Sequence, residues 1–159
     1  MKEELINKLS GFVQSKGVPV RMEPIEGETF LPGLSISDGT LVVDVSRLEW
    51  PGDILHEAAH IALAPPSRRA TTGGKLDVTP AQEMAALAWS YAAAVSAEID
   101  PAIVFHEGGY KQGGAQLLAQ YASGLPPGGP GVPMLQWYGM TTAFPRMNLW
   151  LRETEDPPA

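Results

Sequence analysis

Apolar residues recur at helical spacing in two separated parts of the chain. In the first fifteen residues, every third or fourth position is apolar, at Leu5, Ile6, Leu9, Phe12 and Val13. This period predicts an amphipathic N-terminal helix over residues 3–15, ended near Gly17. A second stripe follows around residues 54–62, where the sequence predicts another helix that is stopped by Pro65-Pro66.

The pattern alternates between these two helices, which is typical of strands. Residues 34–37 and 40–45 are β-rich and flank Asp38-Gly39, a dipeptide that favours a two-residue hairpin turn. Alternation places Leu41, Val43 and Val45 on one face. A further short strand is expected within residues 18–23. The sequence therefore predicts a β-hairpin directly before the helix over residues 54–62.

Residues 79–97 show a helix start followed by an apolar stretch. Thr79 is suited to the N-cap, Pro80 to the first helical position, and Gln82 to closing a capping box. The helix is expected to run to about residue 97 and to be buried, because it is apolar on nearly all sides. Glu83 is its one charged residue before Glu98, and a buried carboxylate is costly unless it is paired or bound to a metal.

The remaining segments have weaker patterns. Residues 65–78 are polar and glycine-containing, which predicts a mobile loop, acting as a lid or only as a linker. Residues 112–123 suit a helix, 125–133 an irregular loop, and 134–150 a short helix with an extended piece. We expect one α+β domain over residues 1–151 and a disordered tail over residues 152–159.

Composition narrows the classes of function. The 159-residue chain has a formal net charge of −7 and no basic run, which argues against nucleic-acid binding. It has no cysteine, so a metal would need His, Asp, Glu or water as ligands. The longest apolar stretch, residues 84–97, is too short to span a membrane, and the N-terminus does not suit a secretory signal. A soluble cytoplasmic protein is expected, and its oligomeric state is left open.

The helix over residues 54–62 carries the sequence His56-Glu57-Ala58-Ala59-His60. Positions four apart lie on one helical face, so His56 and His60 can both bind one metal ion. Glu57 lies at the margin of that face, within reach of a water that the metal activates. This spacing indicates two nitrogen ligands and a general base, the arrangement of zinc-dependent peptidases.

A catalytic zinc site normally needs a third protein ligand. Glu83 is the first candidate, since it lies near the start of a helix that should pack against the helix of His56 and His60. His106 is the second candidate and Asp77 the third. A side chain that donates a hydrogen bond to a developing oxyanion is also expected, and the candidates are His106, Tyr110 and Tyr91.

With Glu83 in an alanine-rich helix downstream of the His-Glu-Ala-Ala-His motif, residues 34–97 resemble the gluzincins, and in particular the ImmA/IrrE-like minimal zincins. The resemblance implies a small zincin-like domain, with a β-hairpin or short sheet packed on the central motif helix and a second buried helix. It also implies that Zn²⁺ is bound by His56, His60 and Glu83, with Glu57 as the base.

These patterns favour a zinc-dependent metallopeptidase that acts on a peptide or protein substrate. An edge strand of the predicted hairpin could hold an extended peptide by main-chain pairing, or the hairpin could only cover the core. Two other functions stay open. One is a catalytically silent metal-binding protein of zincin fold that acts through a protein partner. The other is a metal-free helical interaction protein with its histidines at the surface.

Overall fold

The computed structural model describes residues 2–73, 78–106, 114–123 and 129–155. Its helices are α1 (Lys2–Ser15), α2 (Asp53–Ala62), α3 (Pro66–Arg69), α4 (Pro80–Ser96), the 3₁₀-helix η1 (Pro101–Ile103), α6 (Gly114–Ala122) and α7 (Val132–Trp137). Its strands are β1 (Val20–Met22), β2 (Leu34–Ser37), β3 (Thr40–Val43), β4 (Thr141–Ala143) and β5 (Arg146–Met147). The expected α+β class is confirmed.

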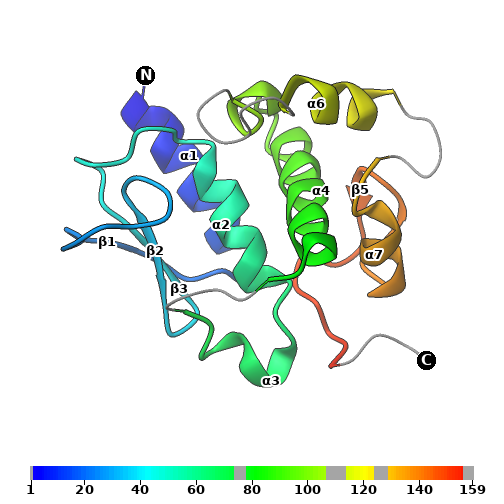
Figure 1. Cartoon of the computed structure of the whole chain (residues 1–159), viewed down its shortest axis with the longest axis horizontal. Helices are drawn as coiled ribbons and strands as arrows, with labels where there is room; N and C mark the ends of the chain where they lie inside the picture. The colour runs from blue at the N-terminus through cyan, green and yellow to red at the C-terminus, as the bar shows by residue number, and fades with distance from the viewer. Residues whose placement is uncertain (1, 74–77, 107–113, 124–128, 156–159) are drawn as a thin grey trace.

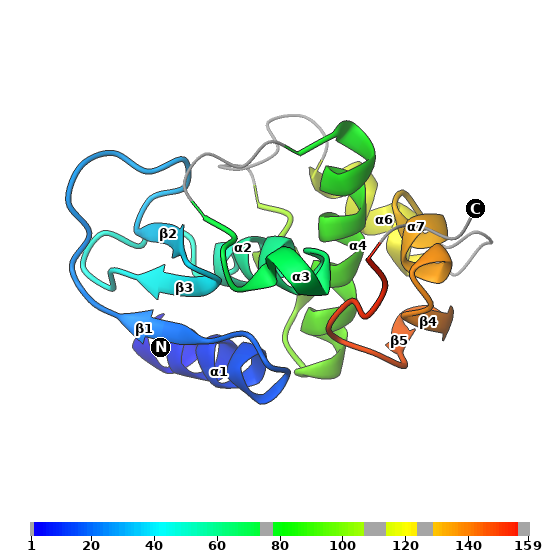
Figure 2. The same cartoon turned by 90° about the horizontal axis from the view of Figure 1, so that it is seen from below.

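The elements lie in successive layers (Figure 1). The sheet of β1, β2 and β3 packs against α2, and α2 packs in turn against α4. On the far side of α4 lie α6 and α7, while α1 lies beneath the sheet and also contacts α2 (Figure 2). The motif helix is therefore enclosed between the sheet, α1 and α4, and one buried hydrophobic cluster runs through all of these elements.

The predicted hairpin is confirmed and forms most of the three-stranded sheet. The strand order is β1-β3-β2, with β1 parallel and β2 antiparallel to β3. Asp38 and Gly39 have φ angles of 47° and 73°, as a type I′ turn requires at its two central positions. The order leaves β2 at one edge of this sheet. Because Ser37 and Thr40 flank the turn as a hydrogen-bonded pair, the main-chain groups of Ile36 point away from β3. Gly73 lies close to this side of β2, since a Cβ on Gly73 would lie 2.8 Å from the Ile36 carbonyl oxygen.

The second strand of the hairpin is shorter than expected. We predicted a strand to residue 45 with Val45 on the same face as Leu41 and Val43, but β3 ends at Val43, and Val45 is 44% exposed while the other two are buried. The cause is Asp44, whose carboxylate accepts hydrogen bonds from the backbone N–H groups of Ile25 and Ser46 and from the Ser46 hydroxyl. These bonds fold the chain into a turn, so the alternation of the strand does not continue.

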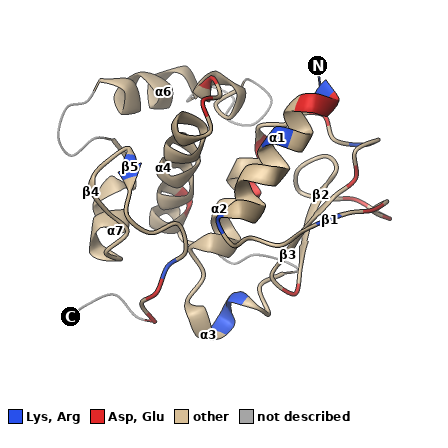
Figure 3. Ribbon diagram, turned by 180° about the vertical axis from the view of Figure 1, so that it is seen from behind, with Lys and Arg blue, Asp and Glu red and all other residues tan. Residues whose placement is uncertain are grey.

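The helix α4 begins as predicted. The Thr79 hydroxyl accepts a hydrogen bond from the N–H of Gln82, and the Gln82 side chain accepts one from the N–H of Thr79. Beyond its first turn most of the helix is buried, and α4, α6 and α7 are almost free of charge (Figure 3). Within the part of the chain that the structure describes, no helix combines the length and the apolarity needed to cross a bilayer.

Described residues of two segments that we expected to be irregular make hydrogen bonds to the end of the motif helix. Within residues 65–78, the short helix α3 forms, and the Arg69 guanidinium donates to the carbonyl groups of Ile61 and Ala64 at the end of α2. The tail that we expected to be disordered from residue 152 begins with a residue that makes such contacts. Arg152 is buried, and its backbone N–H and guanidinium donate to the carbonyls of Ala62 and Leu63.

The region after α4 matches the prediction in part. A helix is confirmed at residues 114–122, and α7 begins at Val132, two residues before the expected start. The extended piece that we expected within residues 134–150 is a second small sheet, in which β4 and β5 pair antiparallel. This part packs on α4 and closes the core on the side away from the main sheet.

Candidate metal centre

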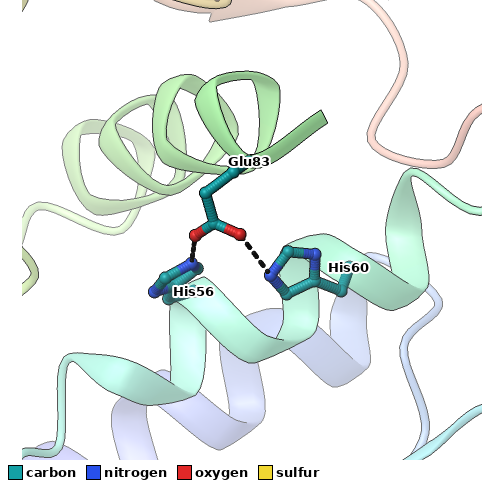
Figure 4. A group of neighbouring side chains, drawn as sticks. All are labelled: His56, His60 and Glu83. Atoms are coloured by element: carbon teal, nitrogen blue, oxygen red, sulfur yellow. Dashed lines mark hydrogen bonds and ion pairs between the residues drawn. The ribbon is translucent and has the colours of Figure 1, made fainter. Parts of the chain in front are cut away.

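Three side chains from two helices converge between α2 and α4 (Figure 4). His56 and His60 lie one turn apart on α2, with ring centroids 5.2 Å apart. Glu83 in the first turn of α4 reaches across to both. One of its carboxylate oxygens lies 2.5 Å from the Nε2 of His56, and the other lies 3.4 Å from the Nε2 of His60.

The donor set fits a metal ion. The three ligand atoms of His56, His60 and Glu83 all lie within 4.8 Å of one another. At zinc–ligand distances of 2.0–2.2 Å, two ligand atoms of a tetrahedral site are roughly 3.4 Å apart. The separation between His60 and Glu83 equals this value, and the contact of His56 with Glu83 would need to lengthen by about 1 Å. The cluster could therefore hold a metal ion with a small rotation of Glu83.

Small side chains bring the two helices close enough for this contact. Ala58, Ala59 and Ala62 on α2 are completely buried, as is the run of alanines on α4, and the two helices pack directly on each other. The capping box fixes where α4 begins, so that the N–H of Glu83 donates to the carbonyl of Thr79. The glutamate then falls in the first helical turn, where the helix dipole favours its charge.

The three ligands influence one another's protonation. Burial and the neighbouring charge of His56 lower the pKa of His60 to about 4. At physiological pH His60 is therefore neutral and can act as a metal ligand. For His56, burial alone would lower the pKa, but the hydrogen bond and the charge of Glu83 raise it above the ordinary value. Burial likewise opposes ionisation of Glu83, yet its contacts with both histidines hold its pKa below the usual range. An incoming cation would therefore replace a proton that His56 and Glu83 hold between them.

Glu57 lies beside the ligands without joining them. Its side chain is 8% exposed, and it makes no hydrogen bond to any residue that the structure describes. Burial raises the pKa of Glu57 to about 7. It lines the same cavity as His56 and His60, so its carboxylate has access to a small molecule bound there. A carboxyl group that titrates near neutrality beside a metal site suits proton transfer.

Two cavities adjoin this cluster, and His56 and Glu83 line both of them. The first, which we call the β2 cavity, has a volume of about 510 Å³ and follows the edge strand at residues 34–36, with Glu57 and His60 in its wall. The second, the α4 cavity, has a volume of about 550 Å³ and lies against Met84, Leu87 and Leu117. Each is large enough for part of a small ligand.

The other candidate residues lie elsewhere. The Nε2 of His106 forms a 2.6 Å hydrogen bond with the Asp53 carboxylate. The His106 ring stacks on Trp50, with 4.3 Å between the ring centroids. Neither His106 nor Asp53 is part of the group of possible metal ligands found among the described residues. Tyr91 packs in a buried aromatic cluster with Phe105, Tyr121 and Phe144. Asp77 and Tyr110 lie outside the described residues.

Sequence patterns did not reveal the Asp53–His106 pair. The two residues are separated by 53 positions, beyond the reach of any helical or strand periodicity. One local signal was Gly52, since a Cβ at this position would lie 2.0 Å from the carbonyl oxygen of Ile103. Only glycine allows the segment that carries His106 to approach the start of α2 this closely.

Comparison with known proteins returned no match to this chain among family models, curated proteins or solved structures. The site is therefore interpreted from its own residues and geometry.

Proposed function

We propose that this protein is a zinc-dependent peptide-bond hydrolase of the zincin type. The observation that supports this proposal is the convergence of His56, His60 and Glu83 beside Glu57, at a cavity that an edge strand borders. Ligand clusters alone occur in structural metal sites. Here a carboxyl group that is not a ligand shares the cavity with the ligands, which is typical of a hydrolytic site.

Two imidazoles and one carboxylate form the ligand set that zinc takes in hydrolytic sites with an open fourth position. When bound, the ion would supply a Lewis acid that polarises a carbonyl group and makes water more acidic. The role of the protein is to hold the three metal-binding side chains in place. In the structure Glu83 already contacts both histidines.

Glu57 is proposed as the group that moves protons. With a pKa of about 7, its carboxylate and its acid form are both populated near neutral pH. It can accept a proton from the attacking water and return it to the leaving amine, which is the two-way role that hydrolysis of an amide needs. Its low exposure limits competition from bulk water.

The edge strand β2 is proposed to hold the substrate backbone. The N–H and carbonyl of Ile36 point away from β3, and neither makes a hydrogen bond to a described residue, although Gly73 lies close to the carbonyl. Ile36 lines the β2 cavity together with residues of the metal cluster. An extended peptide that pairs with this edge would run past His60 and Glu57, whereas a folded chain would not fit the pairing.

The test compares wild-type protein with Glu57→Gln on a library of fluorogenic peptides, after metal analysis of untagged protein. We expect one zinc per chain in both proteins and a loss of turnover by about 10²–10⁴-fold in the variant. Glu28→Gln makes the same chemical change in the wall of the same cavity and should keep its turnover.

Full turnover in the Glu57→Gln variant would remove Glu57 as the base. Zinc bound to wild-type protein without cleavage of any peptide would instead favour a catalytically silent metal-binding protein. Absence of bound metal in untagged protein, even after dialysis against zinc, would remove both.

A further inference from the structure

We propose that the α4 cavity is a specificity subsite that accepts one apolar side chain of the substrate, such as leucine, methionine or phenylalanine. The residue that it accepts flanks the scissile bond on the side away from β2. This inference rests on the proposed function, because it assigns a substrate preference to the same site.

The position of the cavity supports this assignment. His56 and Glu83 form part of its wall and also part of the wall of the β2 cavity, so both spaces adjoin the ligand cluster. A peptide that pairs with β2 and has a carbonyl group at the cluster must continue beyond the cluster. The α4 cavity is the space beside that continuation, and its volume of about 550 Å³ accommodates any natural side chain.

The lining of the cavity determines the chemistry of the occupant. Apart from the ligands, the wall is mostly aliphatic, with Leu31, Met84, Leu87 and Leu117 at its centre. No lysine or arginine among the described residues contributes to it. Of its two other polar residues, Thr79 uses its hydroxyl in the capping box. Asp53 is 1% exposed, with Oδ1 bonded to His106 and Oδ2 buried without a partner among the described residues. A charged side chain would lose its hydration there without gaining a partner.

Two exposed apolar side chains provide a separate argument. Phe30 is 91% exposed and Val78 is 38% exposed, and both line the α4 cavity and the β2 cavity. Among the described residues Phe30 belongs to neither the hydrophobic core nor the partly buried shell around it. An aromatic ring held in water beside a cleft gains from being covered. A bound apolar side chain would cover Phe30 and Val78 together.

The experiment measures binding rather than turnover. N-acetylated hydroxamates of glycine, leucine, phenylalanine, lysine and aspartate chelate zinc through the same group and differ only in the side chain. We expect the leucine and phenylalanine compounds to bind the zinc-loaded protein about 10–100-fold more tightly than the glycine compound in calorimetry. The lysine and aspartate compounds should bind no more tightly than glycine.

Variants of α6 localise the effect. Leu117→Gln places a polar group in the cavity wall and should remove most of the preference for leucine while leaving the affinity for the glycine compound unchanged. Leu118→Gln is the matched control, since Leu118 is also partly buried but lines neither cavity, and it should keep the preference. Phe30→Ala should weaken the preference without affecting the fold, because Phe30 is exposed.

The outcomes separate this inference from the proposed function. Equal affinities for all five compounds, an unchanged preference in Leu117→Gln, or a preference for lysine that Asp53→Asn removes would overturn the apolar subsite and leave the hydrolase proposal standing. No binding of the glycine compound to protein that holds one zinc would overturn the hydrolase proposal, and the subsite with it.

Discussion

Two clusters in this molecule are built from the same chemical groups, an imidazole and a carboxylate. In the metal centre, the Nε2 of His56 lies 2.5 Å from Glu83, and in the second cluster the Nε2 of His106 lies 2.6 Å from Asp53. The metal centre joins the middle turn of α2 to α4, and the second cluster joins the start of α2 to the segment that carries His106. The contacts are almost identical, yet the two clusters have different surroundings.

Access and the number of donors distinguish them. The Glu83 side chain is 32% exposed and borders two cavities, whereas the Asp53 side chain is 2% exposed. The metal centre has a third donor in His60, while in the second cluster Trp50 covers the His106 ring. A histidine–carboxylate contact therefore indicates a ligand site only where a further donor and an open cavity accompany it.

The pKa directions of the two carboxyl groups differ for the same reason. Burial dominates at Asp53 and raises its pKa, although the hydrogen bond and charge of His106 act in the opposite direction. At Glu83 the contacts with two histidines outweigh burial and lower the pKa. Glu83 is thus an anion that can bind a cation, whereas the charge of Asp53 depends on its contact with His106.

The largest expected effect is at Glu83. Glu83→Gln keeps the size of the side chain and removes the anionic ligand, so zinc affinity should fall by on the order of 10²–10³-fold in a competition assay with a chelating dye. Asp53→Asn is the matched change in the second cluster and should keep one zinc at near wild-type affinity. If Asp53→Asn lost the metal and Glu83→Gln did not, the assignment of the two clusters would be reversed.

The second effect is on stability at His106. His106→Ala removes the only hydrogen-bond partner of the Asp53 carboxylate among the described residues, and the ring that stacks on Trp50. Breaking a buried pair in this way should lower the free energy of unfolding by about 3–5 kcal/mol, measured with urea. Zinc stoichiometry should stay at one per chain. Unchanged stability with loss of zinc would show that His106 serves the metal centre.

A third effect concerns pH and Glu57 in metal-free protein. Because the pKa of about 7 in the folded state exceeds the ordinary value of 4.5, the folded protein holds more protons, and stability is lost as the pH rises from about 4.5 through 7. Glu57→Gln should therefore be more stable than wild type by about 3 kcal/mol above pH 7 and equal to it below pH 4.5. If the free energy of unfolding of the two proteins depended on pH in the same way, burial would not raise the pKa of Glu57 in the folded state.

The smallest effect is the stabilisation by zinc itself. At a free zinc concentration one hundred times the dissociation constant, the free energy of unfolding should rise by about 2.7 kcal/mol. His106→Ala should show the same increment from its lower baseline, and Glu83→Gln should show none at that concentration. If zinc did not raise the free energy of unfolding of His106→Ala, the two clusters would be energetically coupled.

Local features of this fold were predictable because they depend on neighbouring residues. The Asp38-Gly39 turn, the capping box at Thr79 and Gln82, and the helical spacing of His56 and His60 all arise from bonds or geometry within a few positions. The end of β3 was missed although it is also local. There, a carboxylate competed with strand pairing, and alternation of apolar residues does not record that competition.

The contacts between distant segments were not predictable from patterns. The parallel pairing of β1 with β3, the stacking of His106 on Trp50, and the bonds from Arg152 to the end of α2 join residues far apart in sequence. Arg152 also lies over the Tyr138 ring at 4.2 Å, so the segment expected to be disordered instead secures the motif helix.

The sequence by itself determined the pair of histidines on one helical face, the neighbouring glutamate, and the apolar helix that carries Glu83 in its first turn, since helical periodicity and capping are properties of adjacent residues. Only the tertiary structure decided that Glu83, and not His106, meets those histidines. It also decided which carboxylate is sealed and which faces a cavity, because burial and donor distance depend on how α2, α4 and the segment after α4 pack together.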